Sequence, residues 1–97
     1  MSYTVDLSLK ARLELFEARL WYEEQQQGLG KRLKDDVFRK IDLIQNNPLH
    51  YPLKNGLREA ETDVFLYLIV YKIVKSKNLI FIVSVFHMKQ HPKKKKR

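Results

Sequence analysis

The chain has 97 residues, 44% of them hydrophobic, and a formal net charge of +8, which predict one small globular domain rather than a disordered segment. It contains no cysteine, which excludes a disulfide framework and thiolate chemistry. No apolar run is long enough to span a bilayer and the first residues lack a signal-peptide pattern, so we expect no membrane contact and a location in the cytoplasm.

The positive charge is concentrated at the C-terminus. Lys93 to Arg97 are all basic, and without them residues 1–92 carry a net charge of only +3. We therefore expect residues 1–92 to form the domain and residues 93–97 to be a disordered, solvated tail. Contact between this tail and nucleic acid is the alternative.

The first half of the chain predicts one short strand and two helices. Residues 3–7 alternate between apolar and polar side chains, as in a half-buried strand, and Ser8 suits the N-cap of a helix. Apolar residues then recur with helical spacing from residue 9 to about residue 27, and again from residue 29 to Asn47-Pro48. Gly28 suits a left-handed cap, and so short a connection makes the two helices antiparallel neighbours.

Two long apolar runs dominate the second half. Residues 64–74 and 79–86 are rich in Val, Ile, Phe and Tyr, which predicts an antiparallel hairpin with Asn78 left-handed in its turn. Before them, residues 49–56 predict a loop with turn signals at Pro52 and Asn55-Gly56, and residues 57–62 predict another strand.

These elements predict an α+β fold in the order β-α-α-β-β-β, with the helical hairpin packed on an antiparallel sheet. The simplest sheet has four strands, all antiparallel. Its core is expected to contain Leu15, Phe38, Ile41, Ile69 and Val83. Because both arms of the strand hairpin are apolar on both faces, we expect one face to be covered by the helices. The other face is left for a partner, or for the chain's own loops and tail.

The order and spacing of these segments resemble the RelE/ParE superfamily, the toxins of type II toxin–antitoxin modules. The resemblance lies in WYEEQQQGLGKRL at residues 21–33, an I-x-x-N-P-x-x-Y-P segment at residues 44–52, and Leu57-Arg58. It continues through FLYLIVY at residues 65–71 and through residues 83–87 followed by Pro92. The long helical hairpin looks more like the ParE branch. This resemblance implies a cognate antitoxin as protein partner and DNA gyrase as the target.

The ribonuclease branch of the superfamily is the alternative, with the ribosome and mRNA as its target. In that branch an arginine commonly follows the aromatic residue of the F-P-Y-like segment, and a tyrosine is frequent near the end. Here that position is Leu68, and no tyrosine follows Tyr71. The departures favour a toxin that acts by binding over an mRNA endoribonuclease. A degenerate member without toxicity is the third possibility.

If the chain is nevertheless an endoribonuclease, its candidate catalytic residues are Arg58, His87, Lys89 and His91. A histidine can serve as acid or base near neutral pH, and the two cationic residues can hold phosphate. The last three share a parity, so they project from one side if the final strand continues through them. The alternative is that His87 is a hydrogen-bonded part of the scaffold and that His91 belongs to the tail.

No other constellation in the sequence indicates a bound group. No glycine-rich phosphate loop follows a strand, and the histidines lack the carboxylate or cysteine neighbours of a metal site. We therefore expect no cofactor and no metal. Trp21 and Tyr22 lie at the end of an amphipathic helix, which favours packing in the core and between helices over a base-stacking platform.

Overall fold

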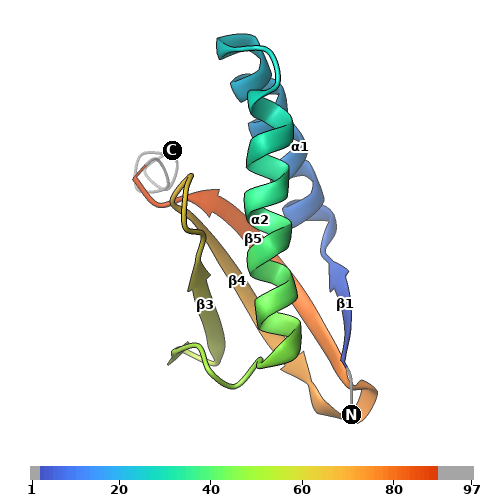
Figure 1. The fold of residues 1–97 in the computed structure, drawn as a ribbon. Coiled ribbons are helices and arrows are strands. Elements are labelled where there is room, and N and C mark those ends of the chain that lie inside the picture. The colour runs from blue at the N-terminus through green and yellow to red at the C-terminus, as the bar shows by residue number, and fades with distance from the viewer. Residues whose placement is uncertain (1–2, 90–97) are drawn as a thin grey trace.

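The computed structural model describes residues 3–89, which form a five-stranded sheet with two helices over one face (Figure 1). The predicted tail and His91 lie outside the described residues. Within residues 3–89, no helix combines the length and the hydropathy needed to cross a membrane. In chain order the elements are β1 (Thr4–Leu7), α1 (Leu9–Gln25), α2 (Leu29–Asn46), β2 (Leu53–Lys54), β3 (Leu57–Glu61), β4 (Tyr67–Val74), the 3-10 turn η1 (Lys75–Lys77) and β5 (Leu79–His87).

The strand order is β1-β5-β4-β3-β2, and the predicted α+β class is confirmed. The all-antiparallel arrangement is wrong in one respect, because β1 pairs with β5 in parallel. The cause is the helical hairpin: α1 leads away from the sheet and α2 leads back, so β3 starts in the same direction as β1 (Figure 1). Two further reversals, into β4 and then into β5, restore that direction and bring β5 beside β1.

Local signals in the sequence act where they were expected. The Ser8 hydroxyl oxygen accepts the Ala11 N–H at 3.0 Å and caps α1. Gly28 (φ +90°) and Asn78 (φ +49°) both take left-handed conformations, one between the helices and one before β5. Asn55 and Gly56 also have positive φ and make a two-residue turn that pairs β2 with β3, a short strand not predicted from the sequence.

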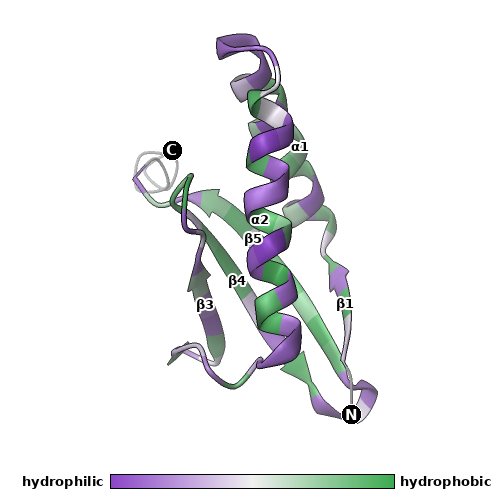
Figure 2. Cartoon of the chain, viewed as in Figure 1, coloured by the Kyte–Doolittle hydropathy of each residue, from purple (hydrophilic) through white to green (hydrophobic). Residues whose placement is uncertain are grey.

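The core lies between the helices and the near face of the sheet. Figure 2 shows hydrophobic residues along most of β4 and β5, as the two apolar runs predict. Leu15, Ile41 and Ile69 are buried there as expected. Phe38, however, is 38% exposed and Val83 is only half-buried, so these two core predictions are wrong.

A β-bulge explains the position of Val83. Val70 pairs with Ser84 and Tyr71 pairs with Ile82, so Val83 has no partner on β4. Beyond the bulge, the side chains of β5 that face the helices change from even-numbered to odd-numbered positions. The fully buried members are Ile80, Ile82 and Val85.

Candidate functional site

The structure separates two of the candidate catalytic residues, Arg58 and His87. Arg58 on β3 lies opposite Tyr71 of β4, whereas His87 on β5 lies opposite Tyr67 of the same strand. The two positions are on opposite sides of β4 and four residues apart along it, which is about 13 Å at the usual rise of a strand. No single phosphate group could contact both side chains in this arrangement.

Arg58 already has partners in the backbone. Its Nη1 donates to the Tyr51 carbonyl oxygen at 2.7 Å and, more weakly, to the Leu49 carbonyl oxygen at 3.5 Å. The side chain is half-buried by this loop. The guanidinium therefore fixes the loop that leads into β2, and sequence reasoning, which offered it as a phosphate clamp, could not anticipate that partner.

His87 is the last residue of β5, and its environment keeps it neutral. Its Nδ1 accepts the backbone N–H of Lys89 at 3.1 Å, and its ring packs edge-to-face on Tyr67 with centroids 5.4 Å apart. Burial, and to a lesser extent the charge of Lys89, lowers the pKa of His87. We expected His87 and Lys89 to project from one side only if the final strand continued through them. The strand ends at His87 and residues 88–89 form a turn, so this condition is not met.

A small cleft opens beside His87, between α1 and the end of β5. Its volume is about 260 Å³, and Glu14, Glu17, Trp21 and Tyr22 from α1 line one side of it. Tyr22 packs against the core and lies edge-to-face on Phe65, in the turn before β4, at 5.1 Å. Trp21 packs on Tyr22 of the same helix at 4.9 Å and remains 50% exposed. We call this feature the His87 cleft.

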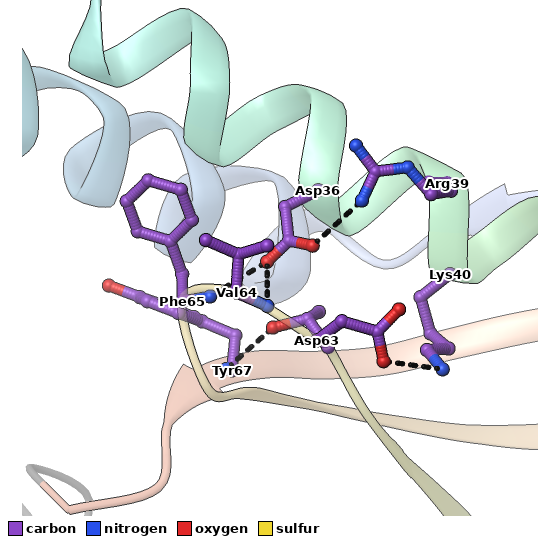
Figure 3. Close-up of polar contacts among 8 residues, drawn as sticks. Asp36, Arg39, Lys40, Asp63, Val64, Phe65 and Tyr67 are labelled. Atoms are coloured by element: carbon purple, nitrogen blue, oxygen red, sulfur yellow. Dashed lines mark hydrogen bonds and ion pairs between the residues drawn. The ribbon is translucent and has the colours of Figure 1, made fainter.

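Asp36 was not singled out by sequence reasoning, yet it organises the turn before β4 (Figure 3). Its carboxylate is 2% exposed and accepts the backbone N–H groups of Val64 and Phe65 at 3.1 and 2.8 Å. Arg39 Nη1 donates to the same carboxylate at 3.2 Å. The available signal was an aspartate on the apolar seam of α2, three residues after the buried Leu33.

The turn held by Asp36 is strained and apolar. Leu66 has φ +59°, a conformation that non-glycine residues seldom adopt. The Thr62 hydroxyl accepts the Tyr67 N–H at 2.9 Å, and the Leu66 carbonyl accepts the Met88 N–H at 3.2 Å. With both ends fixed, the turn presents Val64 and Leu66 to solvent.

The largest exposed apolar feature lies on α1. Leu9, Leu13, Phe16 and Leu20 recur at helical spacing on the side opposite the core, and all are more than half exposed. We call these four residues the α1 apolar stripe. Because the opposite side of the helix carries the buried Ala11 and Leu15, α1 is apolar on two faces.

The stripe borders a groove of about 570 Å³ that reaches α2, where Phe38 completes its apolar wall. Three cationic residues also line this groove, Arg12, Arg19 and Lys34. Within β4 and β5 the large apolar side chains are buried or half-buried. The α1 apolar stripe is an exposed apolar surface that the sequence pattern did not indicate.

Among residues 3–89, no group of three or more His, Cys, Asp or Glu side chains is placed to hold a metal ion. Two surfaces of the described part of the chain are of interest for binding, the α1 apolar stripe with its groove and the smaller His87 cleft.

We compared the chain with known protein families and with solved structures. The family described as "ParE toxin of type II toxin-antitoxin system, parDE" matches residues 5–92. No curated protein sequence matches the chain significantly.

Solved structures show the same fold. The chain is similar to the chromosomal ParDE system from P. aeruginosa, with a TM-score of 0.75, 14% identity, and coverage of 88% of this chain and 95% of that chain. It is similar to the intact E. coli RelBE toxin–antitoxin complex, with a TM-score of 0.67, 18% identity, and coverage of 88% and 95%. For the RelBE2 complex from Mycobacterium tuberculosis the TM-score is 0.65, the identity 22%, and the coverage 90% and 99%.

Proposed function

Because the chain belongs to the ParE toxin family of type II toxin–antitoxin systems, we propose that it acts by binding an essential target and not by cutting RNA. The observation that carries this proposal is the separation of Arg58 from His87 by the full width of β4. RNA cleavage needs an acid–base pair and a cation around one phosphate, and this geometry does not bring the Arg58 guanidinium to the His87 imidazole. The resemblance to ParE-like toxins points to DNA gyrase, and so to action in the cytoplasm.

A cognate antitoxin is the second part of the proposal, and the α1 apolar stripe is its docking surface. Four apolar side chains at helical spacing match one face of an amphipathic helix. The cationic groove residues, Arg12 and Arg19 among them, favour an antitoxin helix with carboxylates along the edge that faces α2. The RelBE and ParDE structures with the same fold are toxin–antitoxin systems, which supports a partner of this kind.

Expressing the chain without its antitoxin tests the target. A gyrase poison should stop DNA synthesis first, while protein synthesis continues until later. The purified chain should also inhibit supercoiling by gyrase in vitro. Leu53→Glu, which adds a charge at an exposed position far from α1, serves as a variant that should retain the effect.

Two other outcomes would decide for the alternatives. Discrete, ribosome-dependent cuts in mRNA, mapped by primer extension and lost in His87→Gln, would replace the binding toxin with a RelE-like endoribonuclease. If neither DNA synthesis nor mRNA is affected at a confirmed protein level, the chain is a non-toxic member of the family.

A further inference from the structure

The His87 cleft has dimensions that suit a side chain rather than a cofactor. Its volume of about 260 Å³ is below the range of about 300–1,000 Å³ that is usual for sites of drug-sized ligands. It lies on the flank of α1 away from the cationic groove, next to the α1 apolar stripe. Glu17 on its rim is four residues after Leu13 and three before Leu20, so it adjoins both on the helix surface.

The walls of the cleft are aromatic. Tyr22 packs against Trp21 with ring centroids at 4.9 Å and against Tyr67 at 6.4 Å, and Tyr67 in turn packs on His87 at 5.4 Å. Such a continuous set of edge-to-face rings presents π-faces whose electron density attracts a cation. Because Trp21 is half-exposed, its ring is accessible from solvent.

The charges of the cleft are all negative. Glu14 and Glu17 contribute two carboxylates, and no lysine or arginine of the described residues lines the cleft. Glu14 is held in place, since its oxygens accept the Ser84 hydroxyl at 2.8 Å and the Val85 N–H at 2.9 Å. The Glu17 carboxylate makes no hydrogen bond or ion pair with the described residues 3–89, so it is available to a ligand.

This acidic cleft stands out in a chain whose net charge is +8. The lowered pKa of His87 adds to the contrast, because a neutral imidazole does not offset the two carboxylates. Two carboxylates with no opposing cation among the lining residues favour a cationic side chain over a neutral one at this place.

We propose that the His87 cleft is the anchor site for one arginine side chain of the partner segment that lies along the α1 apolar stripe. A planar guanidinium stacks on Trp21 and donates to Glu17 at the same time, which the compact ammonium of lysine does less well. The identity of that segment as the antitoxin rests on the function proposed above. The preference of the cleft for a guanidinium does not.

The experiment uses the full chain and two small probes, N-acetyl-argininamide and its neutral analogue N-acetyl-citrullinamide. Trp21 is the sole tryptophan of the chain, so its fluorescence reports directly on the cleft. We expect a saturable change with argininamide, with a Kd on the order of 1–10 mM. The citrulline analogue should bind about tenfold more weakly, because it keeps the shape and loses the charge.

Matched variants locate the site. Glu17→Gln should weaken argininamide binding about two- to fivefold, as expected for an exposed ion pair. Glu24→Gln removes another exposed carboxylate of the same helix, outside the cleft, and should leave binding unchanged. Equal binding of both probes, no saturable change, or equal effects of the two variants would each overturn the proposal.

The chain's own basic tail is the competing occupant. A full-length variant with residues 93–97 all changed to glutamine should bind argininamide as the natural chain does. If only this variant responds, the tail itself fills the cleft and the partner arginine is excluded. None of these readouts depends on gyrase or on an antitoxin, so failure here and failure of the proposed function are separable.

Discussion

Individual polar side chains near the sheet bind backbone groups and hold loops in place. Arg58 binds the Tyr51 carbonyl, and the Tyr71 hydroxyl donates to the Pro48 carbonyl at 2.6 Å. Burial raises the pKa of Tyr71 to about 12, which leaves it a neutral donor at any physiological pH. Asp36 does the same for the turn before β4. Arg58, Tyr71 and Asp36 are thus hydrogen-bonded to backbone groups of loops and turns.

Replacing Asp36 with asparagine tests the importance of the buried carboxylate. Asparagine keeps one acceptor oxygen but turns an amide towards the N–H groups of Val64 and Phe65 or towards Arg39. We expect the free energy of unfolding to fall by about 1–3 kcal/mol, the cost of an unsatisfied buried group. Urea denaturation measures the change.

The neighbouring Asp35 is the matched control. It forms an exposed ion pair with Lys31 at 3.0 Å, so Asp35→Asn should change the free energy of unfolding by less than about 1 kcal/mol. Equal losses in the two variants would show that the Asp36 contacts do not stabilise the turn.

His87 gives the fold a pH dependence whose sign can be derived. Because its pKa is lowered in the folded state, the unfolded chain binds a proton more readily in the interval just below the ordinary value of 6.5. The free energy of unfolding should therefore fall as the pH decreases through that interval. Above pH 6.5 the imidazole is neutral in both the folded and the unfolded chain, and the full stability is present.

The measurement compares urea midpoints at about pH 7.5 and about pH 5.5. In His87→Gln the decrease between the two should be smaller than in the natural chain, while His50→Gln, at an exposed position, should leave the decrease unchanged. A His87 variant with the same decrease as the natural chain would contradict the assignment.

At the scale of elements, the helical hairpin depends on a close contact near its turn. Gly30 in α2 lies against α1 so closely that an added Cβ would be 2.6 Å from the Arg19 carbonyl oxygen. On the same side, the Glu23 carboxylate accepts the N–H groups of Gly28 and Gly30 at 2.9 and 3.0 Å, which lowers the pKa of Glu23. The start of α2 is therefore fixed to the end of α1.

Gly30→Ala reverses the usual effect of such a substitution. Alanine inside a helix is normally about 1 kcal/mol more favourable than glycine. Here the overlap with backbone of α1 costs about 1–3 kcal/mol, so we expect the free energy of unfolding to fall. Circular dichroism during urea denaturation measures it. An unchanged or higher stability would show that the two helices can separate at no cost.

The helices and the longer strands were predictable from the sequence, whereas β2 and the turn that replaces the predicted start of β4 at residues 64–66 were not. Strand pairing was predictable only in part. Helix and strand periods are local properties, and Ser8, Gly28 and Asn78 mark the ends of the elements they adjoin. The bulge at Val83 was not predictable, because Glu14, 70 residues from Ser84, binds the residues beside it. One shifted residue in β5 is enough to change which side chains face the core.

The same limit applies to the candidate site. Whether Arg58 and His87 meet depends on the registers of β3 and β5 against β4, and no motif in the sequence specifies these registers. The parallel pairing of β1 likewise follows from the path of the helical hairpin. Surface features were partly predictable: the sequence indicated unpartnered apolar area on the sheet, but not the exposed stripe on α1.

At the scale of the whole molecule, the helical hairpin extends beyond the sheet and gives the protein an elongated shape (Figure 1). Its exposed face carries the α1 apolar stripe with a cationic groove on one flank and the acidic His87 cleft on the other. On this surface, the apolar side chains of an amphipathic partner helix would pack on the α1 apolar stripe. The charges on the two flanks would determine which face of that helix turns towards each flank.

Phe16→Glu tests whether this face is the partner surface and not merely exposed core. Phe16 is 55% exposed, so a charge there should change the free energy of unfolding of the isolated chain by less than about 1 kcal/mol. Under a partner helix, the same charge would replace a central apolar contact and lose its hydration. We therefore expect antitoxin affinity to fall about 100-fold or more, measured by calorimetry with the product of the neighbouring gene. Leu53→Glu, at a residue 58% exposed on β2, is the control and should bind as the natural chain does. If Phe16→Glu binds normally, the antitoxin docks elsewhere on the molecule.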